Sequence, residues 1–75
     1  MLNVIAAGYQ SGTGDITLNK STGMLKLMAD GGTAVVVLNG VSITLHHGSK
    51  DFQDFPGDYP SWSVTSGNVY WVAFG

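Results

Sequence analysis

The sequence predicts an all-β fold, a small antiparallel sandwich or barrel of about six to seven short strands joined by tight hairpins. The first indication is that eleven glycines, with Ser, Thr, Asn and Asp, separate short runs rich in β-branched residues. The second is that no stretch repeats apolar residues at a helical period over the length that a helix needs. Because 75 residues suffice for one small domain, we expect a single all-β domain over residues 1–75.

The expected strands are separated by glycine-rich turns and by one long loop. Asp30-Gly31-Gly32 is expected to form the turn after the third strand, and residues 48–60 the long loop. In chain order, the expected strands cover residues 2–9, 14–19, 23–29, 33–38, 41–47, 61–66 and 69–74.

The strongest hairpin signal is Asn39-Gly40, which lies between two β-rich runs and fits a two-residue type I′ turn. This turn sets the register of the flanking strands, because directly opposed residues share a face. One face then holds only apolar pairs, and the other mixes apolar with polar residues. The apolar pairs are Leu38 with Val41, Val36 with Ile43 and Ala34 with Leu45, and the mixed pairs are Val37 with Ser42, Val35 with Thr44 and Thr33 with His46.

A second two-residue hairpin is expected at Gly67-Asn68, between residues 61–66 and 69–74. Its register gives one face that carries both tryptophans and an opposite face of mixed character. The first face pairs Val64 with Trp71, Trp62 with Ala73 and Ser66 with Val69, and the second pairs Tyr70, Val72 and Phe74 with Thr65, Ser63 and Ser61.

A third hairpin is expected through the sequence NKSTG at residues 19–23. If residues 19–22 form its loop, Ile16 faces Leu25 on the buried side, and Asp15 lies opposite Lys26 on the outside. An exposed ion pair of this kind contributes about 0.5 kcal/mol and mainly supports the register. Segment 2–9 is apolar on both faces, which suits a strand that is covered on both sides or that pairs with a neighbouring subunit.

The charge inventory excludes several classes of function. The chain has no Arg and no Glu, and only Lys20, Lys26 and Lys50 oppose five Asp residues. Nucleic-acid binders cluster Lys and Arg along the phosphate backbone, so we expect no nucleic-acid partner. The longest apolar runs, residues 34–38 and 69–74, are far shorter than the roughly 20 residues of a membrane helix, so no membrane partner is expected.

The sequence contains neither a recognisable secretion signal nor a cysteine. No basic residue precedes the short apolar run at the start of the chain, which makes a poor secretion signal. The expected location is therefore a virion or the cytoplasm. Because the chain has no Cys, neither disulfides nor Cys-based metal sites can stabilise it.

Three clusters of chemically active residues are too weak to predict a site. His46-His47 could hold a metal ion only if the strand has already ended at His46, because adjacent strand residues point to opposite faces. Asp51, Asp54 and Asp58 could bind calcium, but their spacing is not that of an EF-hand loop, and turn or cap roles are commoner. Ser49, His47 and Asp51 include the residue types of a catalytic triad, yet a domain this small hardly holds a desolvated pocket. We expect no enzymatic activity, no catalytic residue, no metal and no cofactor.

Aromatic residues support an alternative role in carbohydrate binding. Trp62, Tyr59, Tyr70 and Trp71 could stack on sugar faces while Asp and Asn side chains bond hydroxyl groups. The alternative is that Trp62 and Trp71 fill the core, as the C-terminal register predicts for both.

The outer faces of the expected strands carry apolar residues where a free monomer would carry Lys, Glu and Arg. Either the sheet closes and buries some of them, or neighbouring copies or another protein cover them. We expect the second, since a chain of this length can bury little by itself. The candidate interface residues are Val35, Val37, Tyr70, Val72 and Phe74 on the strands, and Phe52, Phe55 and Tyr59 in the long loop.

The function that these features favour is that of a non-enzymatic structural or assembly protein. The composition is typical of a phage-type virion component, such as a capsid decoration (cement) protein or a tail subunit, acting as a homo-oligomer that docks on a larger protein lattice. The oligomer would be a cyclic dimer or trimer. Two alternatives stay open, a small carbohydrate-binding module and a small inhibitor of a host protein.

Overall fold

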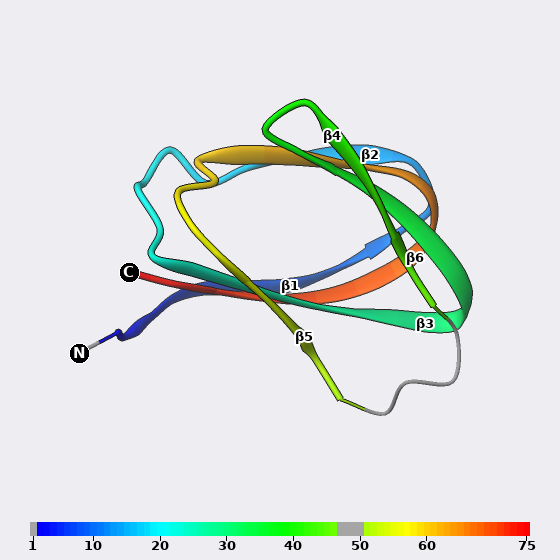
Figure 1. Ribbon diagram of the computed structural model, residues 1–75, viewed down its shortest axis with the longest axis horizontal. Coiled ribbons are helices and arrows are strands. Elements are labelled where there is room, and N and C mark those ends of the chain that lie inside the picture. The colour runs from blue at the N-terminus through cyan, green and yellow to red at the C-terminus, as the bar shows by residue number, and fades with distance from the viewer. Residues whose placement is uncertain (1, 47–50) are drawn as a thin grey trace.

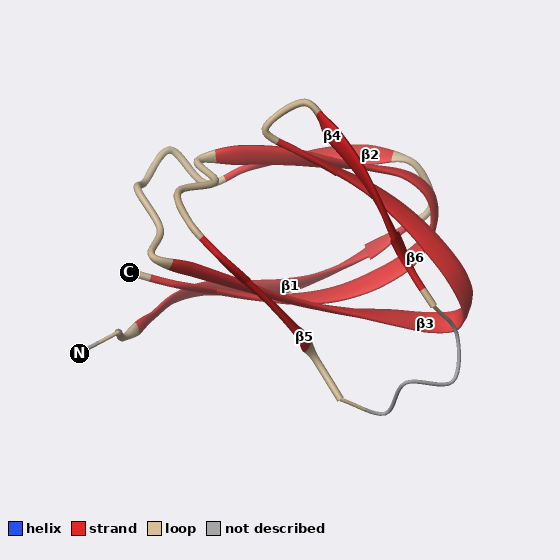
Figure 2. Cartoon of the chain, in the orientation of Figure 1, coloured by secondary structure: helices blue, strands red, loops and turns tan. Residues whose placement is uncertain are grey.

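The computed structural model describes residues 2–46 and 51–75, and this part of the chain consists of β-strands and loops, without a helix (Figure 2). Every strand pair in it is antiparallel and belongs to one open sheet. The predicted all-β class is confirmed, whereas the finer prediction of a sandwich or barrel is not. The strands are β1 (Val4–Ser11), β2 (Gly14–Thr17), β3 (Met24–Leu38), β4 (Val41–Leu45), β5 (Gln53–Pro56) and β6 (Ser61–Phe74).

Two long strands, β3 and β6, form the centre of the sheet and pair along most of their length. β1 and β2 follow one another along the outer side of β6, and β4 and β5 pair with the outer side of β3. The sheet therefore has two halves. The "β1 half" contains β1, residues 69–74 of β6, residues 24–30 of β3 and β5, and the "β2 half" contains β2, residues 61–66, residues 34–38 and β4.

A line of glycines bends the sheet where these halves meet. Gly12, Gly31 and Gly67 have φ angles of 76°, 74° and 82°, a region that glycine enters without steric cost. The Gly12 N–H donates to the Gly67 carbonyl oxygen at 3.1 Å, and the β3–β6 register shifts between Asp30 and Val35. Bulges of this kind bend a strand sharply. In Figure 1 the β2 half consequently lies above the β1 half, and both chain ends lie at the same side.

The hairpin expected at Gly67-Asn68 and the turn expected at Asp30-Gly31-Gly32 are both wrong. Each glycine segment bends one continuous strand, because residues 61–66 pair with β2 and residues 69–74 pair with β1 instead of with each other. The expected faces are nevertheless correct except at Ser66, which was expected beside Val69 on the inner face but is exposed and lies opposite Val35. Trp62 and Val64 point inward before the bend and Val69 and Ala73 after it, because the extra residue of the bulge shifts the alternation as a hairpin would.

The hairpin expected through residues 19–23 is also wrong, since β2 pairs with β6 and not with β3. Asp15 lies opposite Ser63, and Lys26 lies opposite Asp54. Residues 18–23 cross from one half to the other. The Leu18 N–H donates to the Pro60 carbonyl at 2.8 Å, and at the other end the Gly23 N–H donates to the Phe74 carbonyl at 2.8 Å. These bonds hold the two ends of the connection on different halves.

The hairpin at Asn39-Gly40 is confirmed. Both residues have positive φ angles, 49° and 80°, as a type I′ turn requires. The register agrees with the expected one for all pairs from Leu38–Val41 to Ala34–Leu45. β4 ends at Leu45, so the expected pair of Thr33 with His46 is not part of the ladder.

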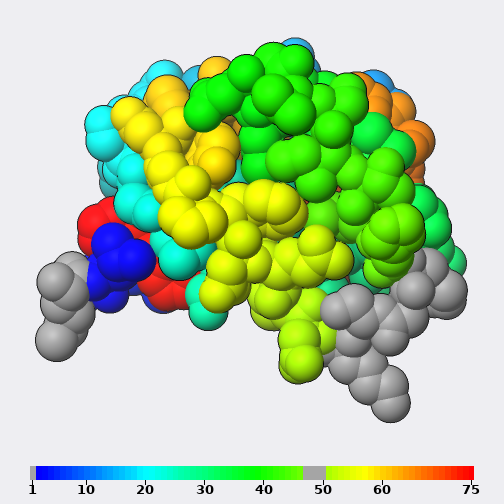
Figure 3. Space-filling model, in the orientation of Figure 1, coloured from blue at the N-terminus to red at the C-terminus, as the bar shows by residue number. Residues whose placement is uncertain are grey.

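The expected long loop contains a strand that the sequence did not suggest. β5 pairs with residues 24–27 of β3, so that Phe55 lies opposite Leu25 on the inner side. Pro56 occupies the last position of this edge strand, a place that tolerates a missing N–H. Both β4 (green) and β5 (yellow) lie on the face of the molecule that Figure 3 shows.

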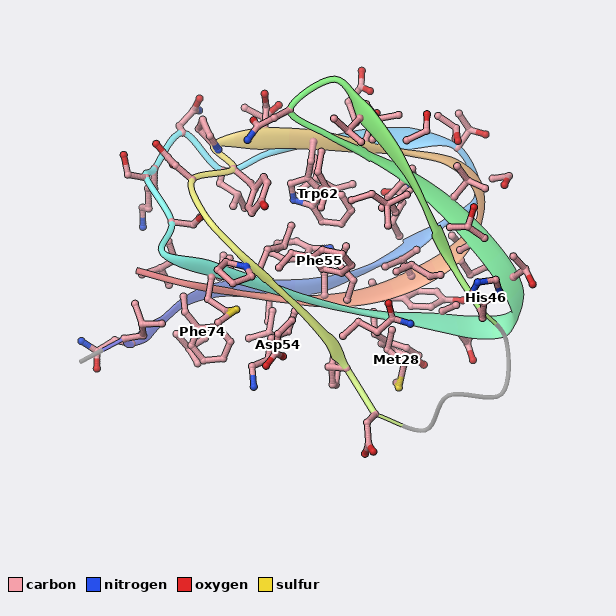
Figure 4. The ribbon with its side chains drawn as sticks, in the orientation of Figure 1. Met28, His46, Asp54, Phe55, Trp62 and Phe74 are labelled. Carbon is pink, nitrogen blue, oxygen red and sulfur yellow. The ribbon has the colours of Figure 1, made fainter. Side chains whose placement is uncertain are left out.

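The core lies between the two halves. Trp62 of the β2 half and Trp71 of the β1 half meet there edge to face, with ring centroids 5.9 Å apart and an interplanar angle of 84°. Figure 4 shows Trp62 and Phe55 in this space and Met28, Asp54 and Phe74 on the far side of the β1 half. The buried apolar residues are Ile16, Leu25, Leu27, Ala34, Val36, Leu38, Leu45, Trp62, Val64, Val69 and Ala73.

Candidate interaction surface

The outer side of the β1 half exposes several large apolar residues close together. It is built from three rows of opposed residues: Val4, Phe74, Met24 and Pro56; Ala7, Val72, Lys26 and Asp54; and Tyr9, Tyr70 and Met28. We call this surface the apolar face. The exposed fractions of Val4, Tyr9 and Tyr70 are 60%, 45% and 41%. Exposed apolar residues gathered on one side are a common feature of interaction surfaces, so this face is the candidate for one.

The apolar face exists because strand alternation puts the odd-numbered residues of β6 inside and the even-numbered ones outside in this half. Val69 and Ala73 are fully buried, whereas Tyr70 is exposed and Val72 and Phe74 are half-buried. β1 adds Val4 and Tyr9 beside them through its register with β6.

The two charges within the apolar face neutralise each other. The Lys26 Nζ lies 3.6 Å from Asp54 Oδ1, with exposed side-chain fractions of 39% and 53%. A pair this exposed stabilises the fold by about 0–1 kcal/mol. The same ammonium lies 5.6 Å from the centre of the Phe74 ring, within the distance of a cation–π contact. The middle of the face therefore carries no net charge that would repel an apolar partner.

Tyr9 and Tyr70 form the aromatic end of this face. Their ring centroids are 4.5 Å apart with a tilt of 44°, and the Tyr9 hydroxyl donates to Asp30 Oδ2 at 3.0 Å. The pKa of Tyr9 is raised above its ordinary value of 10.0 by partial desolvation, by the hydrogen bond to Asp30 and by the negative charges of Asp30 and ionised Tyr70. The phenol is therefore favoured over the phenolate in the folded chain.

This shift predicts a pH dependence of stability. Because the folded pKa of Tyr9 exceeds the unfolded one, the contribution is fully present below about pH 10 and is lost as the pH rises through the folded pKa. In a spectrophotometric titration, Asp30→Asn is expected to lower the pKa of Tyr9, identified by difference from Tyr9→Phe. Asp15→Asn, which changes a carboxylate in the other half, should leave the curve as it is. An unchanged curve for Asp30→Asn would contradict the role of this hydrogen bond.

The outer side of the β2 half has a different character. Its exposed residues are mostly hydroxyl-bearing, and they surround the half-buried Val35 and Val37. The Thr65 hydroxyl donates to the Val35 carbonyl at 3.2 Å. The hydroxyl-bearing residues are Thr17, Ser42, Thr44, Ser61, Ser63 and Thr65.

A hollow of about 390 Å³ lies on this hydroxyl-rich side, between β2, β6 and the Asn39-Gly40 turn. Asp15 is the one titratable group among the described residues that line it. A nucleophile with a separate base and orienting group is thus not assembled there.

The candidate interface residues from the sequence separate into three places. Tyr70, Val72 and Phe74 lie together on the apolar face, with Phe52, 38% exposed, just before β5. Val35 and Val37 lie on the opposite half. Phe55 and Tyr59 are half-buried against the core of their own chain, and the Tyr59 hydroxyl donates to the Pro56 carbonyl at 3.0 Å.

Sequence reasoning missed Val4, Tyr9, Met24 and Met28. Their membership of the face depends on pairing between β1, β6 and β3, which no local turn signal encodes. A bulge between Val4 and Ala6 also interrupts the alternation of β1, so that its faces could not be read by simple period-two counting.

The weaker candidates are not assembled into sites. Asp54 pairs with Lys26, and Asp58 Oδ1 accepts the Thr22 N–H at 3.0 Å, so neither carboxylate caps a local turn as the sequence suggested. Among residues 2–46 and 51–75, no three His, Asp, Glu or Cys side chains are grouped to hold a metal ion. His47 and Ser49 lie outside the described residues. Trp62 is 4% exposed, as expected for a core residue, so it cannot serve as a sugar platform.

Comparison of the chain with protein-family models, with curated proteins and with solved structures gave no match. In the described residues, no helix is long and apolar enough to cross a membrane.

Proposed function

We propose that this protein is a non-enzymatic structural or assembly protein whose apolar face is buried against a larger protein lattice. The observation that supports this most directly is the exposure of Val4, Tyr9 and Tyr70 on one side of the sheet. The hydroxyl-rich outer side of the β2 half serves as an internal comparison, because it resembles an ordinary solvated sheet face.

The assembly role that fits best is that of a phage-type virion component, a capsid decoration protein or a tail subunit, acting as a homo-oligomer. The support is compositional: a 75-residue all-β chain with few charges, no Cys, no Arg and no Glu. Such a chain gains stability and specificity by burying apolar surface on a partner rather than by enlarging its own core.

The test is particle association of tagged variants produced in the native source. Wild type is expected to sediment with assembled particles, and Tyr70→Lys to do so about tenfold less, since a buried aromatic anchor contributes 1.4 kcal/mol or more to binding. Thr17→Lys places the same charge on an exposed strand position of the β2 half and should behave as wild type. Wild type that remains with the free protein, or Tyr70→Lys that sediments as well as Thr17→Lys, would contradict the proposal.

A further inference from the structure

β1 is a free edge of the sheet. Within the described chain it pairs on one side only, with β6, so half of its backbone N–H and C=O groups face away from the sheet. Proteins usually protect such edges by keeping the strand short or by placing Lys, Pro or an inward-pointing charge on it. β1 has eight residues, VIAAGYQS, with neither a charge nor a proline.

The other outer strands are shorter or better protected. β5 has four residues, including Asp54 and Pro56, and β2 has four residues, including Asp15. β4 is uncharged but has only five residues. The longest outer strand therefore carries neither a charge nor a proline, and the bulge between Val4 and Ala6 leaves its run from Ala6 to Ser11 regular.

The hydrogen-bonding pattern between β1 and β6 shows which backbone groups of β1 point away from β6 and are free to bond another strand. The Gly12 N–H bonds the Gly67 carbonyl, and the ladder continues without a shift from Ser11–Asn68 to Ala6–Ala73. Because an antiparallel ladder bonds alternate residues, Ala7 and Tyr9 direct their N–H and C=O groups to the free side. Their side chains are exposed and belong to the apolar face.

We propose that β1 pairs antiparallel with β1 of a second copy of this chain around a two-fold axis, which joins two β1 halves into one continuous sheet. This inference rests on the assembly role proposed above. An extended strand is the partner that satisfies a row of free backbone groups. A second β1 matches in length, brings no like charge against it, and offers the small side chains of Ala6, Ala7 and Gly8 at the centre of the contact.

Self-pairing of β1 is favoured over pairing of β1 with β4 of the next copy. The latter would leave part of the eight-residue strand without a partner, because β4 has five residues. It would also be a head-to-tail contact, which grows into open filaments unless its rotation closes a ring. Two-fold pairing uses the same edge of both copies, so it produces a closed dimer. It also makes the two apolar faces continuous across the β1–β1 contact, where Val4, Ala7 and Tyr9 of each copy lie.

The test is sedimentation equilibrium of the full chain over a range of concentrations. Wild type is expected to be a dimer, and Ala7→Pro, which removes an outward N–H without removing a β1–β6 bond, should raise the dimer Kd at least tenfold. Thr44→Pro is the matched control. In the β3–β4 hairpin the hydrogen-bonded pairs alternate from Leu38–Val41, so the N–H of Thr44 also points away from the sheet. It should dimerise as wild type does.

A second pair of variants and a second measurement cover the possibility that proline disturbs folding. Ala7→Lys should weaken the dimer and Thr44→Lys should not, with tryptophan fluorescence confirming that both are folded. Hydrogen exchange should protect the Ala7 and Tyr9 amides only at concentrations where the dimer forms. A wild-type chain that stays monomeric, or one whose association is abolished by Thr44→Pro and not by Ala7→Pro, would overturn the proposal.

The experiments separate this inference from the proposed function. Tyr70→Lys should reduce particle association about tenfold and remain a dimer, because Tyr70 lies on β6, whose backbone takes no part in the pairing of two β1 strands. If the wild-type chain forms a dimer but does not sediment with particles, the lattice role is contradicted and the pairing of β1 is supported. If it is a monomer that sediments with particles, the pairing of β1 is contradicted and the lattice role is supported.

Discussion

Gly67→Ala is expected to destabilise the protein by about 3 kcal/mol, of which about 1–2 kcal/mol is the cost of a left-handed backbone angle for a residue with a Cβ and the rest is overpacking. A Cβ at this position would lie 2.8 Å from the Ala34 Cα and 2.8 Å from the Thr33 carbonyl oxygen. These are backbone atoms of the neighbouring strand, so they can move only if the β3–β6 ladder opens at its bend. For a 75-residue chain, whose net stability is roughly 4–11 kcal/mol, this is a large fraction of the total.

Urea unfolding followed by tryptophan fluorescence measures this loss, and Gly31→Ala is the matched control. Gly31 has nearly the same φ angle, 74°, but a Cβ there meets no atom within 4 Å. Its substitution should therefore cost only the backbone term, about 1–2 kcal/mol. Equal losses for the two variants would mean that the close approach of the strands at Gly67 does not constrain the fold.

Thr22→Val is expected to cost about 2–3 kcal/mol, because it leaves two backbone groups of the segment before β6 without their partner. Thr22 is 7% exposed. Its hydroxyl donates to the Gly57 carbonyl at 2.7 Å and accepts the Tyr59 N–H at 2.9 Å. Valine keeps the shape of the side chain and loses both bonds, so the effect isolates the polar contribution.

Thr22→Ser is the control for this variant, since it keeps the hydroxyl and removes one methyl group, at a cost of about 0.8 kcal/mol. Thermal unfolding should rank wild type above Thr22→Ser and Thr22→Ser above Thr22→Val. In Thr22→Val, the Tyr59 amide should also exchange its hydrogen faster than in wild type. Equal stability of the two variants would show that water replaces the hydroxyl without loss.

The segment of residues 51–59, which contains three Asp-aromatic pairs, shows which contacts the sequence can predict and which it cannot. Its rings were candidates for a partner interface, and in the structure Phe55 and Tyr59 pack against the core of their own chain. The carboxylates were expected to cap local turns, yet Asp54 and Asp58 contact Lys26 and Thr22, far away in the chain. A local pattern shows that a carboxylate needs a partner, but long-range pairing determines which one it has.

The sequence by itself determined the all-β class, the type I′ turn at Asn39-Gly40 and the inward or outward direction of most strand residues. These follow from local sterics, because alternation and turn angles depend on neighbouring residues only. Only the tertiary structure decided whether Gly31 and Gly67 reverse the chain or bend it, and hence which strands pair. A glycine permits both, and the choice depends on which distant strand offers the better ladder and core contacts. The apolar face and the free edge of β1 both result from that choice.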